Sequence, residues 1–99
     1  MASPHDVKSP KAHWTLIDVL HVADNPENGG WAIALGEWKA KRRLACRWNG
    51  KDKGLGNPSS RGVPTWFILP DEFVEPLMKS GIIPGNKRAL VSALLTKAA

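Results

Sequence analysis

Two runs of alternating large and small residues, separated by a short polar connection, constrain the fold of this chain most. Trp31–Trp38 (WAIALGEW) places a large side chain at nearly every second position, and Arg42–Asn49 (RRLACRWN) continues the alternation. A period of two is typical of half-buried β-strands. Because the Lys39–Lys41 connection is so short, we predict that the two runs form an antiparallel hairpin.

Two further strands are predicted, one before and one after this hairpin. The segment HWTLIDVLHVA, residues 13–23, is rich in β-branched and aromatic residues, and the turn-forming cluster Asp24–Gly30 ends it. The short apolar run Thr65–Leu69 (TWFIL) is ended by Pro70. Between the hairpin and this last strand, the Gly- and Pro-rich segment 49–64 is predicted to be a long loop, of the kind that is often functional or mobile.

The C-terminal third predicts two helices. Pro70 and the acids after it are typical of a helix start, so we expect a helix from about Asp71 to Gly81, distorted near Pro76. A second helix is expected over Lys87–Lys97, capped by Asn86, with Leu90, Val91, Leu94 and Leu95 on its buried side. The predicted fold is therefore α+β, a small antiparallel sheet of about four strands with two C-terminal helices packed on one face.

Length and composition bound the organisation of the chain. Its 99 residues indicate one domain, which we assign to residues 13–99, preceded by a flexible N-terminal arm over residues 1–12 that lacks any periodicity. No apolar run approaches the length of a membrane span, and the N-terminus lacks the hydrophobic core of a signal peptide. The one cysteine excludes an internal disulfide and fits a reducing compartment, so we expect a cytoplasmic protein without a membrane partner.

Positive charge is concentrated in the stretch Lys39–Arg61. This stretch carries a net charge of +7 in a chain whose formal total is +5, so the remainder sums to −2. Clustered cations raise the local potential and favour an anionic partner. The cations concerned are Lys39, Lys41, Arg42, Arg43, Arg47, Lys51, Lys53 and Arg61.

The alternation in the hairpin also predicts where some of these cations point. If the large residues of both strands face the core, the opposite face is formed by Ala32, Ala34, Gly36, Arg43, Ala45 and Arg47. We expect that face to lie in solvent, as a shallow surface of small residues on which the guanidinium groups flanking Cys46 pool their charge.

No catalytic or metal-binding pattern accompanies the charge. The segment Gly54–Gly62 (GLGNPSSRG) lacks both the Gly-Lys-Ser/Thr ending of a P-loop and the third glycine of a dinucleotide fingerprint. Cys46 lies between apolar residues on its strand, so a buried and inert thiol is expected. His5, His13 and His21 lack metal-ligand spacing. We therefore predict a protein that is not an enzyme and that has no metal site and no cofactor.

The function predicted best is a small basic module that binds nucleic acid, DNA or RNA, through the cationic hairpin and the adjacent Gly-rich loop. Cations neutralise phosphates, while Trp38, and Trp48 or Trp66 near the loop, could stack on bases. The predicted site is formed by the eight cations and Trp38. The alternative is a protein-interaction module without nucleic acid, in which Arg42, Arg43 and Arg47 dock an acidic protein or the Ala-rich face forms a homodimer.

Overall fold

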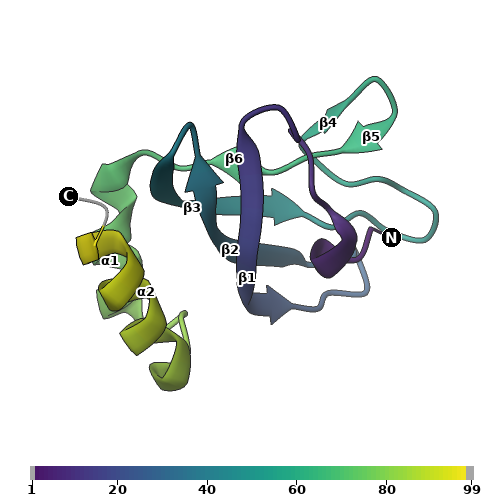
Figure 1. Cartoon of the computed structure of the whole chain (residues 1–99). Helices are drawn as coiled ribbons and strands as arrows, with labels where there is room; N and C mark the ends of the chain where they lie inside the picture. Colours follow the sequence, from purple (N-terminus) through teal and green to yellow (C-terminus); the bar gives the residue numbers. More distant parts are fainter. Residues whose placement is uncertain (1, 98–99) are drawn as a thin grey trace.

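The computed structural model describes residues 2–97, and from residue 94 onward it describes the backbone alone. Within these residues the main sheet has four antiparallel strands in the order β1-β2-β3-β6, and Figure 1 shows two helices at one end of it. The predicted α+β fold is therefore confirmed. The strands are β1 (Trp14–Ala23), β2 (Trp31–Trp38), β3 (Lys41–Trp48) and β6 (Phe67–Ile68), and a separate two-stranded ribbon pairs β4 (Ser59–Ser60) with β5 (Val63–Pro64).

The predicted hairpin is confirmed as β2 and β3. Trp38 is paired with Lys41, so the turn consists of Lys39 and Ala40. Both turn residues have positive φ, 50° and 67°, which is the backbone of the tight turns that match the twist of paired strands.

The large residues of β2 and β3 face the helices, as the alternation predicts. Ile33, Leu35 and Leu44 are buried together with Leu20 of β1, and they pack on the helical layer. That layer consists of a 3-10 turn η2 (Asp71–Phe73), α1 (Val74–Ser80) and α2 (Gly85–Lys97), which contribute Val74, Leu77, Met78, Leu90 and Val91 to the same cluster, joined by Ile83 from the turn between the helices.

Two details of the helices differ from the prediction. Pro76 does not distort a helix interior, because α1 begins only at Val74 and Pro76 lies in its first turn, where a backbone N–H has no intrahelical partner. Asn86 does not cap α2, since the helix begins at Gly85 and the carbonyl of Pro84 accepts its first hydrogen bonds. Gly81 ends α1, as predicted, and it adopts the left-handed conformation. Leu94 and Leu95 lie outside the residues whose side chains are described.

The opposite face of the sheet is not the open surface that the alternation suggested. Ala32, Ala34 and Ala45 are fully buried beneath Trp14, Trp66 and the N-terminal segment. The expectation of a solvent-facing Ala-rich face is therefore wrong. Small residues are used here because large aromatic side chains lie directly on the sheet: a Cβ on Gly36 would come within 2.3 Å of the Trp14 ring.

The N-terminal segment, predicted to be a flexible arm, makes specific contacts with this face. It contains a 3-10 turn η1 (Pro4–Asp6), after which Val7 is buried. The indole Nε1–H of Trp66 donates to the Val7 carbonyl at 2.6 Å, and the amide of Trp66 donates to the Ser9 carbonyl at 3.0 Å. The helices thus cover part of one face of the sheet, and the arm and two tryptophans cover the other.

Candidate functional site

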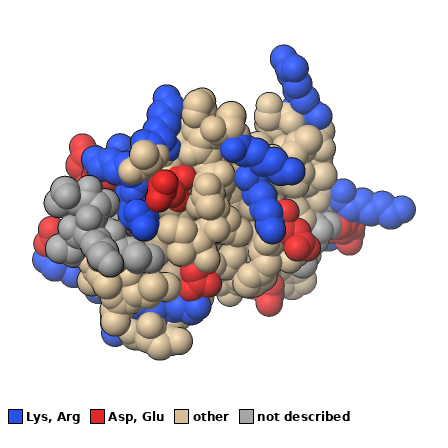
Figure 2. Space-filling view, in the orientation of Figure 1, with Lys and Arg blue, Asp and Glu red and all other residues tan. Residues whose placement is uncertain are grey.

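The eight predicted cations do not form one pooled surface. Residues Lys41 and Trp48, at the two ends of β3, are separated by roughly 24 Å of extended chain. Lys39, Lys41, Arg42 and Arg43 belong to the hairpin end, whereas Lys51, Lys53 and Arg61 follow the other end. Figure 2 shows Lys and Arg side chains in several separate places on the visible face, with Asp and Glu between them.

Three cations at the hairpin end are paired with the protein's own acids. Asp71 accepts from Lys41 Nζ at 2.9 Å and from Arg43 Nη1 at 3.2 Å. Arg42 Nη1 lies 3.2 Å from the Glu37 carboxylate. These pairs leave Lys39 as the hairpin cation that has no ion pair with a described residue, and its ammonium lies over the Trp38 ring, 5.5 Å from the centroid.

Trp38 is partly buried rather than presented as a free stacking platform. It packs against the cluster on the Ala-rich face, and the His13 ring meets it edge-on with centroids 5.5 Å apart. Trp38 and Arg43, two residues of the predicted site, line one shallow depression with Ile68 and Pro70. Because Asp71 already holds Arg43, this depression offers little free charge to an anion.

Arg47 is inside the protein, so the expectation that it faces solvent is wrong. The residue is 2% exposed, and its guanidinium donates to the carbonyls of Thr65 and Leu55. Burial lowers the pKa of Arg47 from its usual value. A cation held this way organises the chain around it, because it ties the Gly-rich loop to the segment before β6.

The Gly-rich loop is closed at its base rather than open. The backbones of Trp48 and Asn57 exchange hydrogen bonds of 2.7 and 3.0 Å. Inside the loop, Gly50 and Gly56 have positive φ, and a Cβ on Gly56 would lie 1.9 Å from the Trp48 carbonyl. The loop glycines therefore permit close backbone approach, and they hold Lys51 and Lys53 on a structured loop.

An apolar groove lies next to this loop, on the part of the sheet face beyond the helices. We call it the aromatic groove; its volume is about 580 Å³, and it is lined by Trp31, Cys46, Arg47, Trp48, Asn57, Pro58 and Phe67. Trp48 is 51% exposed and Phe67 is 55% exposed. Trp31 is paired with Trp48 across the hairpin, and Phe67 is paired with Cys46, which brings the ring-bearing side chains onto one face. An exposed aromatic surface of this kind marks a binding site more often than a scattered apolar residue does.

Sequence reasoning named Trp48 as a stacking candidate but missed Phe67 and Trp31. The pairing of β6 with β3 puts Phe67 beside Cys46. The residue pattern of neither strand alone predicts which other strand it pairs with. The period-two alternation did place Trp31, Cys46 and Trp48 on one face. It could not show that the helices stop short of that end of the sheet.

The groove holds no constellation for metal binding or nucleophilic catalysis. Burial raises the pKa of the Cys46 thiol above its usual value, which disfavours the reactive thiolate. Among residues 2–97, no group of three His, Cys, Asp or Glu side chains is arranged to hold a metal ion. The groove presents the faces of aromatic rings, and the cations Lys51, Lys53 and Arg61 follow it closely in the sequence.

Comparison of the chain with protein-family models, curated proteins and solved structures finds no match. In the described part of the chain, no helix has the length and apolar character needed to cross a membrane.

Proposed function

We propose that the protein binds single-stranded nucleic acid, with bases stacking on the aromatic groove and phosphates meeting cations of the adjoining loops. The observation that carries this proposal is the exposure of Trp48 and Phe67, whose rings are about half exposed on the same face of the sheet. Base stacking on such rings contributes about 1–3 kcal/mol per base and tolerates any sequence. Unpaired bases are required, because the faces of duplex bases are already stacked on one another.

Three cations of the predicted set support this proposal, because they lie at the groove end of the chain and have no acid partner among the described residues. Lys51, Lys53 and Arg61 are exposed and make no ion pair with the described residues. Each lies three or four residues from a residue that lines the groove, a chain distance of at most about 14 Å. The proposed interface therefore moves from the hairpin tip, where charges are paired, to the loop end of β3.

The test is fluorescence anisotropy of labelled oligothymidine, oligouridine and a DNA duplex, each titrated at low and at moderate salt. Trp48→Ala and Phe67→Ala should each weaken single-strand binding about fivefold or more. Lys51→Ala and Lys53→Ala should each reduce the log–log salt slope by roughly 0.7. Phe73→Ala is the matched control, because Phe73 is 49% exposed but does not line the groove. Absence of binding at low salt, or equal loss with Phe73→Ala, would refute the proposal.

A second candidate is a protein partner, either an acidic segment or a second copy of the chain, docked in the same groove. The apolar lining favours it, since the one charged lining residue, Arg47, directs its guanidinium to backbone carbonyls. Sedimentation velocity separates the two candidates. A dimer that Phe67→Ala dissociates, combined with an absence of oligonucleotide binding, would support the protein partner.

A further inference from the structure

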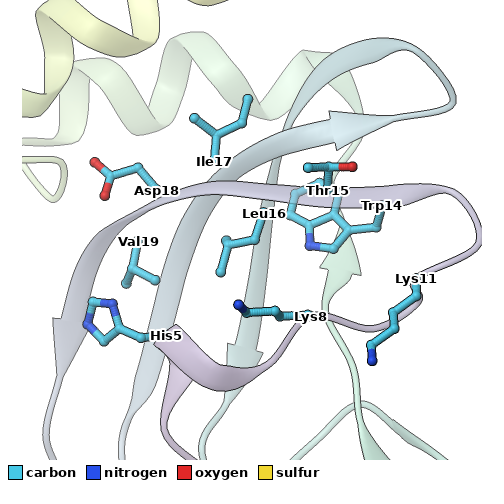
Figure 3. A pocket seen from close by; sticks show the side chains of 9 residues that line it. All are labelled: His5, Lys8, Lys11, Trp14, Thr15, Leu16, Ile17, Asp18 and Val19. Atoms are coloured by element: carbon cyan, nitrogen blue, oxygen red, sulfur yellow. The ribbon is translucent and has the colours of Figure 1, made fainter.

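A second pocket lies on the other side of the molecule's core, between the N-terminal segment and β1. We call it the arm pocket; its volume is about 490 Å³. Figure 3 shows that one wall is β1 and the other is the N-terminal segment. Because β1 is the first strand in the order β1-β2-β3-β6, this wall is an outer edge of the sheet.

The arm wall contributes three basic side chains, His5, Lys8 and Lys11, which Figure 3 shows on the arm side of the pocket. All three are exposed, and none makes an ion pair with a residue of the described chain. The one acid that lines the pocket, Asp18, is already neutralised by Lys87, with 2.5 Å between Nζ and Oδ2. The free charge at this pocket is therefore positive.

The β1 wall contributes a buried donor that has no acceptor. Trp14 is 3% exposed, and its indole Nε1–H has no hydrogen-bond partner among the described residues. Figure 3 shows the indole nitrogen on the edge of the ring that faces the arm. A buried donor left unpaired costs free energy, which a ligand oxygen entering between the ring and the lysine stems would recover.

The remaining lining on the β1 wall is largely apolar. Val19 belongs to the buried cluster beneath the pocket and Leu16 packs against it, whereas the exposed Ile17 points to the other side of the strand in Figure 3. The volume is within the range of small-molecule sites, which combine an apolar lining with a few placed polar groups.

We propose that the arm pocket binds a small phosphate monoester that carries an apolar group. The phosphate lies beside the Lys8 ammonium, with the Lys11 side chain turned toward it and one oxygen accepting from the Trp14 indole, and the apolar group lies against Leu16 and Val19. A dianionic phosphate suits this set of cations better than a carboxylate, because it brings two charges and three acceptor oxygens. This site is separate from the aromatic groove and does not depend on nucleic-acid binding.

The test is a titration with phenyl phosphate, followed through the indole N–H signals of the tryptophans in two-dimensional ¹H–¹⁵N NMR. The Trp14 signal, identified by its loss in Trp14→Phe, should shift in a saturable way and more than the other four. If Trp14→Phe does not fold, perturbation of the signal by Lys8→Ala and by Lys11→Ala assigns it instead. Each of these lysine variants should weaken binding by about tenfold or more, as expected for loss of a hydrogen bond between charged groups. Lys79→Ala, which removes an exposed lysine of α1, should leave it unchanged.

Three control titrations complete the experiment. Benzoate and inorganic phosphate should bind more weakly than phenyl phosphate, and Trp48→Ala should leave phenyl phosphate binding unchanged. Equal binding of benzoate would overturn the preference for phosphate. No shift at millimolar phenyl phosphate, or a shift of the Trp48 signal in place of Trp14, would overturn the site itself. Failure of oligonucleotide binding, by contrast, would leave this result unaffected.

Discussion

Arg47 Nη1 donates a hydrogen bond of 2.5 Å to the carbonyl of Thr65, and its other terminal nitrogen donates to the carbonyl of Leu55. One side chain of β3 thus holds two segments that follow it in the chain, the Gly-rich loop and the approach to β6. This buried cation is a structural centre around which the loop end of the sheet is built, and the exposed cations at that end are Lys51, Lys53 and Arg61.

Replacing Arg47 with Ala should lower the free energy of unfolding by roughly 3 kcal/mol. The reason is that two backbone carbonyls lose charged donors, each worth about 1.5–3 kcal/mol. Part of that loss is offset because the variant no longer buries a charged group. Urea denaturation monitored by tryptophan fluorescence measures the change. Arg61→Ala is the control and should stay within about 0.5 kcal/mol of wild type, because Arg61 is exposed and makes no ion pair with the described residues. Equal losses for the two variants would contradict the structural role.

Arg47 also shows how far the sequence alone could lead. The alternation correctly puts the side chain of Arg47 on the face of the sheet opposite to Cys46 and Leu44, because side-chain direction in a strand depends only on local geometry. It does not show that Trp14, Trp66 and the N-terminal segment cover that opposite face. This covering depends on contacts between residues up to 59 positions apart, such as the bond from Trp66 to Val7.

Some residues of the candidate site could likewise be predicted from the sequence, and others could not. Trp48 and the free cations Lys51, Lys53 and Arg61 were predictable from charge and composition. Phe67 was not, because its place in the groove depends on the pairing of β6 with β3. The pairing of Asp71 with Lys41 and Arg43 was equally hidden, because the two ends of each ion pair lie about thirty residues apart.

Gly56→Ala should destabilise the protein much more than Gly62→Ala. Both glycines have positive φ, 73° and 78°, so both substitutions carry a similar backbone penalty of about 1–2 kcal/mol. A Cβ at position 56 would also lie 1.9 Å from the Trp48 carbonyl, whereas a Cβ at position 62 meets nothing within 4 Å. We expect Gly56→Ala to cost at least about 2 kcal/mol more in urea denaturation, since the backbone pairing of Trp48 and Asn57 must give way. A difference below the error of the measurement would show that the loop adapts without loss.

Asp71→Asn should reduce stability at neutral pH by less than about 1 kcal/mol, because the carboxylate is half exposed and such pairs are weak. The hydrogen bond from Lys41 is the main cause that lowers the pKa of Asp71; slight burial opposes it, and the charges of Arg43 and Lys41 add to the lowering. A group whose pKa is lower in the folded state stabilises the fold above its unfolded pKa of about 3.9. That contribution is lost as the pH falls through the folded pKa.

The difference in stability between wild type and Asp71→Asn should therefore be constant from neutral pH to about pH 5 and should shrink below pH 4. Urea denaturation across this range measures it, with Glu75→Gln as the control for an exposed acid paired within one helix. A difference that grows on acidification would contradict the assigned sign.

Trp66→Phe should release the N-terminal segment from the sheet. The substitution keeps an aromatic ring in the core but removes the Nε1–H that donates to the Val7 carbonyl at 2.6 Å, leaving that carbonyl buried without its partner. The loss should be about 1–3 kcal/mol. It should also speed amide hydrogen exchange at Val7, and less so around Ser9, whose carbonyl still accepts from the backbone amide of residue 66. Trp48→Phe is the control and should change neither quantity by much, since Trp48 is half exposed. If the amides of residues 3–11 exchange without protection in wild type and Trp66→Phe changes nothing, the segment is the mobile arm that its composition predicted, and the arm pocket has only one wall.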